Sequence, residues 1–264
     1  MTSAGAPLLS CRNLTKNFGA LSAVKNLSFD LEAGETLGIG GPNGAGKTTL
    51  FDTISGLAPV SSGEVRFEGR DVTRLSPEQI CHRGILRTFQ LNAGFDSLTV
   101  VETALAAAQF GRDDRWWPGL RFDPAARKRC DEALALAGLA PWRNMLTETL
   151  PILERKLLMI ASALAAQPKL LLLDEPAGGL TPKEIDQMIG VVEAVRAQGV
   201  SIILIEHVMR FLVRLSSRVI IMHHGEKIYE GPPDGLALDP LVVEVYLGAG
   251  ASSHLNMRAA SRRA

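Results

Sequence analysis

The sequence predicts an α/β fold: a core with parallel strands, an antiparallel β subdomain at its N-terminal side, and an inserted α-helical subdomain. Three observations predict this fold. A glycine-rich loop at residues 41–49 follows a β-like run and precedes a helical pattern. Continuous apolar runs of strand length lie at residues 169–176 and 201–207. Helical spacing replaces strand alternation between residues 98 and 166.

Two stretches near the N-terminus, residues 8–14 and 23–31, alternate apolar and polar side chains as an antiparallel pair of strands does. Phe18 lies between them. A lone phenylalanine is more often a core residue, and this residue alone favours that interpretation. The alternative is stacking on a nucleotide base, which contributes about 1–3 kcal/mol and requires a nucleotide to bind nearby.

Residues 41–48 match the pattern G-x-x-x-x-G-K-[ST] in the strand–loop–helix setting that this pattern requires. Glycines let the main chain wrap a phosphate chain and aim successive N–H groups inward, where side chains would obstruct them. The following helix directs its positive end at the same phosphates. Lys47 would reach the β- and γ-phosphate oxygens, and the Thr48 hydroxyl would ligate Mg²⁺. The full match disfavours the competing interpretation, a glycine-rich turn with a surface lysine. The predicted phosphate-binding residues are Gly41, Pro42, Asn43, Gly44, Ala45, Gly46, Lys47, Thr48 and Thr49.

Turn and strand signals continue after this helix. Residues 61–64 are typical of a turn, and residues 65–69 resume strand alternation. Ser76, followed by proline, begins a short helix as a hydroxyl N-cap. Residues 84–90 then predict a strand that ends on Gln90.

Alanine and leucine dominate from residue 98 to about residue 166, and Trp116-Trp117 interrupts the helical spacing. We interpret this region as a helical subdomain inserted into the α/β core. The paired tryptophans either pack within the insert or anchor a contact with a partner, and packing is favoured.

An apolar run capped by acids, at residues 169–176, is typical of a central parallel strand whose carboxyl end faces a site. Asp174 would hold the Mg²⁺ shell. Glu175 points differently because side chains alternate along a strand, so it can address the attacking water. Two adjacent acids alone would favour a solvated turn, whereas the phosphate-binding loop favours the catalytic interpretation.

Thr181 begins a capping box with proline at the first helical position, so a helix starts there. The next buried run ends on His207. Such a histidine is usually structural, but beside a nucleotide it is a candidate donor to the γ-phosphate. Residues 218–229 predict a hairpin with its turn at His224 and Gly225.

Charge and cysteine usage limit the classes of partner. Lysine plus arginine number 28 and aspartate plus glutamate number 28, which gives no support for a nucleic-acid partner. Cys11, Cys81 and Cys130 match no metal spacing and are expected to be reduced thiols. No apolar run approaches the roughly 18 residues of a spanning helix, and residues 1–10 lack an export signal. We therefore expect a cytoplasmic protein that touches a membrane only through a partner.

In order and approximate spacing, the phosphate-binding loop, Phe18, Gln90, Asp174-Glu175 and His207 resemble the motifs of ATP-binding cassette proteins. The loop together with the Leu-Leu-Leu-Leu-Asp-Glu-Pro strand is highly specific for that family. The resemblance implies a P-loop NTPase core of the RecA-like type with a helical insert. The implied bounds are 8–248 for the whole domain, 8–92 and 167–248 for the core, 93–166 for the insert and 249–264 for a flexible tail.

The resemblance also implies roles for single residues. Phe18 would stack on adenine and so join the nucleotide-binding residues, and Gln90 would sense Mg²⁺ and water at the joint with the helical subdomain. Residues 178–182 look like the loop that crosses to a partner subunit. The implied cofactors are ATP and Mg²⁺. The implied catalytic residues are Glu175 as general base, His207 as a γ-phosphate contact and Gln90, and the implied metal ligands are Thr48, Gln90 and Asp174.

Within the family, residues 87–90, 205–207, 225–228 and 243–248 look like those of the ATPases of branched-chain amino-acid importers. This likeness implies ATP-driven uptake of branched-chain amino acids or of related amino acids and amides. It implies a peripheral position on the inner face of the cell membrane. The implied partners are a second cassette ATPase, two membrane permeases and, indirectly, a periplasmic binding protein.

The family signature L-S-G-G-Q is degenerate in this chain, and both glycines are absent. In the family dimer, each ATP lies between one subunit's phosphate loop and the other subunit's signature. Leu153 replaces the second glycine and should hinder that approach, and Pro151 lacks an N–H group. We therefore expect an asymmetric heterodimer with one competent site. The signature positions are Leu150, Pro151, Ile152, Leu153 and Glu154.

Two other functions remain open. A soluble cassette ATPase of assembly or DNA maintenance is disfavoured, because the sequence has no second cassette, long coiled coil or basic run. A regulatory subunit that holds ATP without turnover is favoured by the altered signature and disfavoured by the intact Glu175 and His207.

Overall fold

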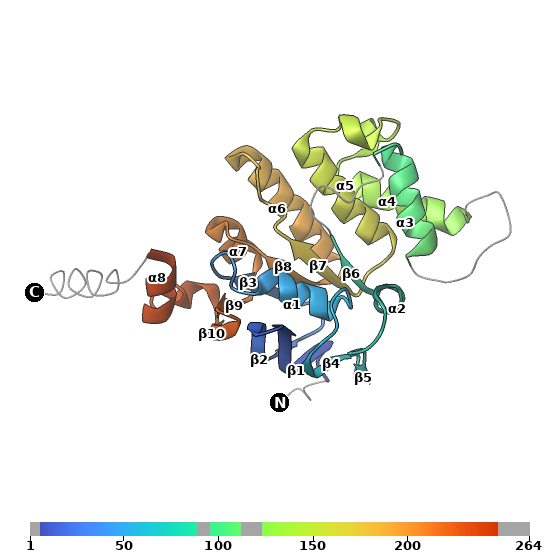
Figure 1. The fold of residues 1–264 in the computed structure, drawn as a ribbon. Helices are drawn as coiled ribbons and strands as arrows, with labels where there is room; N and C mark the ends of the chain where they lie inside the picture. Colours follow the sequence, from blue (N-terminus) through green and yellow to red (C-terminus); the bar gives the residue numbers. More distant parts are fainter. Residues whose placement is uncertain (1–5, 89–95, 112–122, 248–264) are drawn as a thin grey trace, which may run out of the picture.

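The computed structural model describes residues 6–88, 96–111 and 123–247, which form two β-sheets and a group of helices (Figure 1). The strands are β1 (Leu9–Phe18), β2 (Leu21–Leu31), β3 (Thr36–Gly40), β4 (Ser62–Phe67), β5 (Arg70–Asp71), β6 (Ile85–Arg87), β7 (Leu170–Asp174), β8 (Ser201–Ile205), β9 (Arg218–His223) and β10 (Glu226–Gly231). The helices are α1 (Lys47–Ile54), α2 (Pro77–His82), α3 (Val100–Phe110), α4 (Pro124–Leu136), α5 (Ile152–Ala165), α6 (Pro182–Ala197), α7 (Met209–Leu215) and α8 (Pro240–Leu247), with 3-10 turns at Ala140–Trp142, Thr147–Thr149 and Pro233–Gly235.

The larger sheet has the strand order β10-β9-β3-β8-β7-β6. Strand β3 pairs in parallel with β8 and β9, and β7 pairs in parallel with β8 and β6. Because these strands run in one direction, the carboxyl ends of β3, β7 and β8 meet at one edge of the sheet. Strand β10 is antiparallel to β9 and confirms the predicted hairpin. Its turn residues His224 and Gly225 both have positive φ, at 49° and 82°, as a tight hairpin turn requires.

The smaller sheet has the order β2-β1-β4-β5 and is antiparallel throughout. It confirms the predicted N-terminal strand pair, with longer strands than the alternation indicates. The turn predicted at residues 61–64 is wrong, because Ser62 already pairs with Thr15 of β1. Gly63 has a φ of 94°, and a Cβ there would lie 2.4 Å from the Asn13 carbonyl oxygen. The glycine therefore serves a close approach of two strands rather than a turn.

Helix α1 lies between the two sheets (Figure 1). Its apolar side chains Leu50, Phe51 and Ile54 are fully buried. They belong to one cluster with residues of β1, β2 and β4 and with residues of β3, β7 and β8. This packing fixes the start of α1, at Lys47, close to the carboxyl end of β3, from which the phosphate-binding loop departs.

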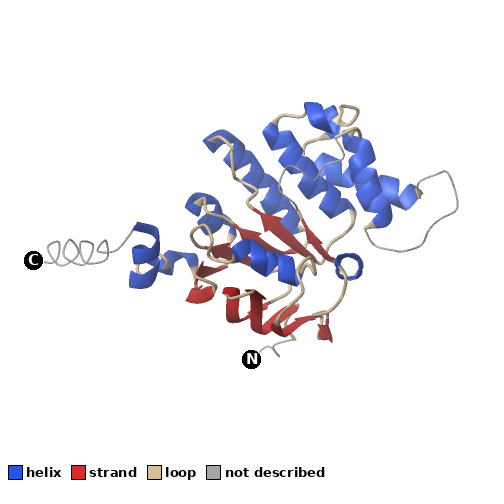
Figure 2. Ribbon diagram, in the orientation of Figure 1, coloured by secondary structure: helices blue, strands red, loops and turns tan. Residues whose placement is uncertain are grey.

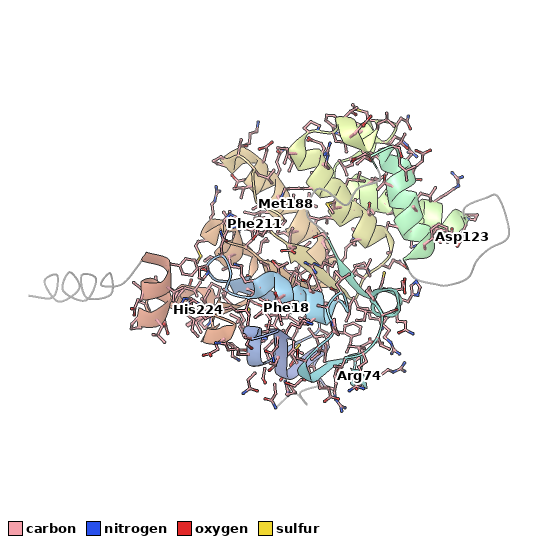
Figure 3. The ribbon with its side chains drawn as sticks, viewed as in Figure 1. Phe18, Arg74, Asp123, Met188, Phe211 and His224 are labelled. Carbon is pink, nitrogen blue, oxygen red and sulfur yellow. The ribbon has the colours of Figure 1, made fainter. Side chains whose placement is uncertain are left out.

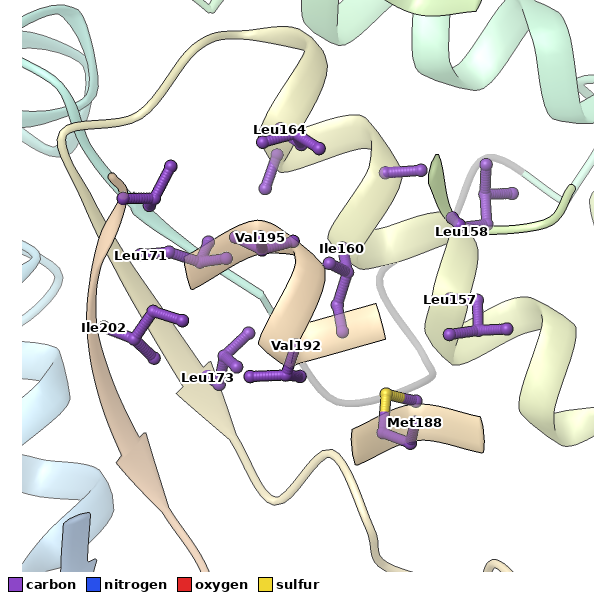
Figure 4. Packing of buried hydrophobic residues seen from close by; sticks show 14 of the residues in the cluster. Leu157, Leu158, Ile160, Leu164, Leu171, Leu173, Met188, Val192, Val195 and Ile202 are labelled. Atoms are coloured by element: carbon purple, nitrogen blue, oxygen red, sulfur yellow. The ribbon is translucent and has the colours of Figure 1, made fainter. Parts of the chain in front are cut away.

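The other face of the larger sheet is covered by helix α6 and by the predicted helical insert, which contains α3, α4 and α5 (Figure 2). In the close view, side chains of β7 and β8 face those of α6, with α5 packed beyond (Figure 4). The residues in this layered contact are Leu171 and Leu173 of β7, Ile202 of β8, Met188, Val192 and Val195 of α6, and Leu157, Ile160 and Leu164 of α5. Helix α6 begins at the predicted capping box, with Thr181 as its N-cap.

Several predictions concern residues that lie outside the described ranges. These are Gln90, the Trp116-Trp117 pair and the tail at 249–264, and the insert bounds 93–166 stay a prediction. Among the residues that the structure does describe, every helix is too short or too polar to cross a membrane.

Candidate nucleotide-binding site

The predicted phosphate-binding loop joins the end of β3 to the start of α1. Gly46 is the N-cap of α1, with a φ of 99°, and no side chain of the described residues forms a hydrogen bond at this cap. The first N–H groups of the helix are therefore left for a ligand, and they combine with the positive end of the helix dipole to favour an anion. Thr48 and Thr49 lie in the first turn of the same helix.

Two different constraints favour glycine in this loop: close contact with neighbouring strands, and a left-handed backbone conformation. A Cβ at Gly41 would lie 2.2 Å from the Met222 carbonyl oxygen, and one at Gly46 would lie 2.0 Å from the Ala23 carbonyl oxygen. Strands β9 and β2 therefore exclude side chains at both positions, whether or not a phosphate is bound. Gly44 has open space around its Cβ position but a φ of 78°, so only its backbone conformation favours glycine there.

The Lys47 ammonium group is folded over the loop. Its Nζ donates hydrogen bonds to the carbonyl oxygens of Gly41, at 2.7 Å, and of Pro42, at 2.9 Å. Burial lowers the pKa of Lys47, while the negative charges of Glu175 and Asp174 raise it. This lysine is therefore within electrostatic range of both predicted acids.

Asp174, the last residue of β7, is buried and ion-paired. Its Oδ2 accepts a hydrogen bond from Arg87 of β6 at 2.7 Å, and Arg87 also binds Oδ1 of Asp52 in α1 at 2.5 Å. The Arg87 guanidinium lies 5.6 Å from the ring centroid of Phe51. The other carboxylate oxygen of Asp174, Oδ1, is buried and has no hydrogen-bond partner within the described part of the chain. It is therefore the oxygen that remains for a ligand.

Arg87 is a residue of this site to which the sequence analysis gave no role. It appeared only within the stretch 87–90 that resembles the importer ATPases. The signal that could have found it is an arginine at the carboxyl end of a strand, since parallel neighbours end at the same edge and β7 ends there on Asp174.

Glu175 follows β7 in a left-handed conformation, with a φ of 48°. Its N–H group donates to the carbonyl oxygen of Ile205 at 3.0 Å. The prediction that its side chain diverges from Asp174 through strand alternation gives the wrong cause, because Glu175 lies just beyond the strand. Its Oε1 lies 3.9 Å from Nδ1 of His207, and both side chains reach solvent. The predicted general base and the predicted γ-phosphate contact are therefore neighbours.

Phe18 is 52% exposed, so the core interpretation favoured by the residue alone is wrong. It is the last residue of β1 and is labelled in Figure 3. The Lys16 ammonium lies 4.8 Å from the ring centroid of Phe18. Strand β2, which follows, passes beside Gly46 at Ala23. The exposed ring thus belongs to the hairpin that borders the phosphate-binding loop.

The degenerate signature lies at the start of helix α5. Pro151 is its N-cap and supplies no side-chain hydrogen bond to the first turn. Leu153 is only 5% exposed and packs within the helical insert, so the steric obstruction predicted for it is wrong. Ile152 instead is 51% exposed at the helix start, next to Pro151, which is also exposed.

The Arg87 ion pairs generate a stability prediction. Arg87→Met keeps most of the side-chain volume but leaves Asp174 buried and unpaired, so we expect the free energy of unfolding to fall by about 3–5 kcal/mol. Arg12→Met is the matched control, because its partner Asp30 is half-exposed, and it should cost less than about 1 kcal/mol. Urea unfolding of both variants measures the difference, and equal losses would contradict this account of the site.

The sequence is similar to a known protein family and to characterised relatives. Residues 24–178 match the family described as ABC transporter. The chain is 32% identical to the high-affinity branched-chain amino acid transport ATP-binding protein BraF of Pseudomonas aeruginosa, over 92% of this chain and 98% of that protein. It is 34% identical, with the same coverage, to LivG of Escherichia coli, which carries the same description.

Solved structures give the same result for the fold. A nucleotide-free ATP-binding cassette from an ABC transporter matches with a TM-score of 0.82 and 29% identity, over 92% of this chain and 100% of that chain. The ADP conformation of MJ1267, an ATP-binding cassette of an ABC transporter, matches with a TM-score of 0.82 and 28% identity over the same shares. Sequence, fold and the geometry around Lys47 thus agree, and the chain belongs to the ABC transporter family as an ATP-binding and ATP-hydrolysing subunit.

Proposed function

We propose that this chain hydrolyses ATP with Mg²⁺ at the carboxyl ends of β3, β7 and β8, and thereby drives uptake of branched-chain amino acids or related amino acids and amides. The observation that carries the proposal is the convergence of chemical groups at this edge. The negative charges of Glu175 and Asp174 raise the pKa of Lys47, against the effect of its burial. Nδ1 of His207 lies 3.9 Å from Oε1 of Glu175. The solute class rests on BraF and LivG, whose names describe branched-chain amino acid transport.

In this mechanism, the loop N–H groups and Lys47 bind the β- and γ-phosphates, and Phe18 stacks on the adenine. The Glu175 carboxylate accepts a proton from the water that attacks the γ-phosphorus. The bond from the γ-phosphorus to the bridging oxygen breaks, which releases ADP and inorganic phosphate. His207 donates a hydrogen bond to a γ-phosphate oxygen. Its ring lies next to Glu175, so both side chains reach the same phosphate group.

Two described residues fit a magnesium ion, one at the end of β7 and one in the first turn of α1. Asp174 Oδ1 is buried without a hydrogen-bond partner among the described residues, and Thr48 is exposed in the first turn of α1. Carboxylate and hydroxyl oxygens suit this hard cation. Gln90 is the third proposed ligand and completes the set. Bound Mg²⁺ would neutralise charge on the phosphate oxygens.

An apolar groove supports contact with a membrane permease. A cavity of about 560 Å³ opens between α2 and β6 of the core and α3 and α5 of the helical insert. Leu57, on the core side, is 46% exposed, and Phe110, at the end of α3, is 57% exposed. A permease segment bound in this groove would be displaced by any movement between the core and the helical insert, because each supplies one wall of the groove. A permease contact of this kind would hold the chain at the inner face of the cell membrane.

The signature supports an asymmetric heterodimer with a second cassette ATPase. At the start of helix α5, the family signature has small residues that lie against the partner's nucleotide. This chain has Pro151, which lacks an N–H group, and the exposed Ile152 at these positions. The site formed by this chain's own loop, Glu175 and His207 is then competent when the partner supplies an intact signature. The site formed on the partner's loop is capped poorly.

Turnover in the reconstituted transporter tests this assignment. Glu175→Gln in this chain should remove most ATP hydrolysis and most uptake of labelled leucine, because it disables the competent site. The corresponding carboxylate-to-amide change in the partner ATPase is the matched control and should leave most of both activities. Equal contributions from the two sites would overturn the asymmetry, and hydrolysis unaffected by Glu175→Gln would overturn the catalytic role.

Docking in the groove has its own test. Phe110→Asp places a charge in the apolar groove and should abolish co-purification with the permease subunits while leaving MgATP binding unchanged. Leu238→Asp is the control, because Leu238 is 82% exposed and lies outside the groove. If both variants co-purify equally with the permeases, the groove is not the docking site.

A further inference from the structure

A buried carboxylate adjoins the site but has no role in the mechanism above. Glu206 follows the last residue of β8 and is 0% exposed. Its Oε1 accepts a hydrogen bond from the N–H group of Ala177 at 2.6 Å. Its Oε2 accepts from the N–H groups of His207 and Val208, both at 3.1 Å. Three main-chain donors therefore converge on one buried side chain, which offsets the cost of removing that side chain from water.

The donors belong to two loops that carry the chemistry. Ala177 lies in the turn two residues after Glu175, and His207 and Val208 lie between β8 and α7. The strand ladder between these segments ends where the Glu175 N–H group meets the Ile205 carbonyl oxygen, at 3.0 Å. Beyond that point, among the described residues, the Glu206 carboxylate accepts hydrogen bonds from both loops at once.

Lys156 extends this link to the helix that carries the degenerate signature. Its Nζ donates to the Glu175 carbonyl oxygen at 2.9 Å, from the second turn of α5. Burial lowers the pKa of Lys156, and the charges of Glu206 and Glu175 raise it. Burial also raises the pKa of Glu206, and the three N–H donors oppose that shift. The Lys156 ammonium and the Glu206 carboxylate therefore both hydrogen-bond to the main chain of residues 175–177.

We propose that Glu206 is a positioning residue for ATP hydrolysis, whose carboxylate ties the loop after β7 to the loop after β8 and so fixes Glu175 against His207. The proposal rests on the catalytic roles given to those two residues under the proposed function. Glu206 itself is fully buried and is not a catalytic residue. Its contribution depends on accepting hydrogen bonds at both oxygens, and a carboxylate presents acceptors without donors at both.

Glutamine is the informative replacement, because it keeps the volume of glutamate and replaces one acceptor oxygen with an N–H donor. In Glu206→Gln that amide nitrogen would face at least one main-chain N–H group. The two loops then lose part of their link without a cavity being created. A misplacement of catalytic groups on this scale lowers turnover, whereas the phosphate-binding loop, which Glu206 does not touch, is left intact.

The experiment compares variants of the full chain in the reconstituted transporter. In Glu206→Gln, kcat for ATP hydrolysis should fall at least about tenfold, while the dissociation constant for a fluorescent ATP analogue changes less than about twofold. Glu35→Gln is the matched control: it makes the same chemical change at a carboxylate that pairs with Arg218 at 2.8 Å, before β3, and kcat should be retained. A retained kcat in Glu206→Gln, or a parallel loss of nucleotide affinity, would overturn the proposal.

Two further measurements separate positioning from general stability. If Glu206 acts through His207, the kcat losses of Glu206→Gln and His207→Ala should not multiply in the double variant, whereas multiplying losses would overturn the proposal. In the wild-type chain, the amide protons of Ala177, His207 and Val208 should exchange slowly although they lie in no strand or helix, and rapid exchange would overturn it. The proposed function fails separately, if Glu175→Gln itself leaves kcat unchanged.

Discussion

The parallel alignment of β3, β7 and β8 is the constraint on which the rest of the structure depends. Parallel neighbours end at the same edge, so the loops that leave them are brought together although they are far apart in sequence. The phosphate-binding loop, Asp174-Glu175 and Glu206-His207 are those loops. An antiparallel pairing at any of the three strands would carry one of these groups to the opposite edge and leave the site incomplete.

The edge concentrates charge in a region of low exposure, and each buried charge there has a defined partner. Arg87 binds Asp174 and Asp52, the Lys47 ammonium binds two loop carbonyl oxygens, and Glu206 binds three N–H groups. Because a buried unpaired charge is costly, these contacts hold the edge together as well as arrange it. The main exception within the described residues is Asp174 Oδ1, which is the oxygen proposed for Mg²⁺.

Local patterns were sufficient to predict most of the strands, the capped helices, the helical insert and the strand–loop–helix setting of the glycine-rich loop, because each depends on residues close in sequence. They failed where neighbours from other segments decide. The exposure of Phe18, the burial of Leu153 and the left-handed turn at Glu175 follow from tertiary packing. Arg87 and Glu206 acquire their partners only when strands from separate parts of the chain align, so spacing within the sequence does not identify those partners.

The central claim is that main-chain amides and one ammonium group grip a triphosphate at this edge. Calorimetric titration of the purified chain with MgATP, in the presence of its partner subunits, tests it most directly. The account predicts measurable binding by the wild type and an affinity at least about tenfold weaker in Lys47→Ala, because a charge-assisted contact to the phosphates is lost. Absence of binding by the wild type, or equal affinity in the two proteins, would contradict it.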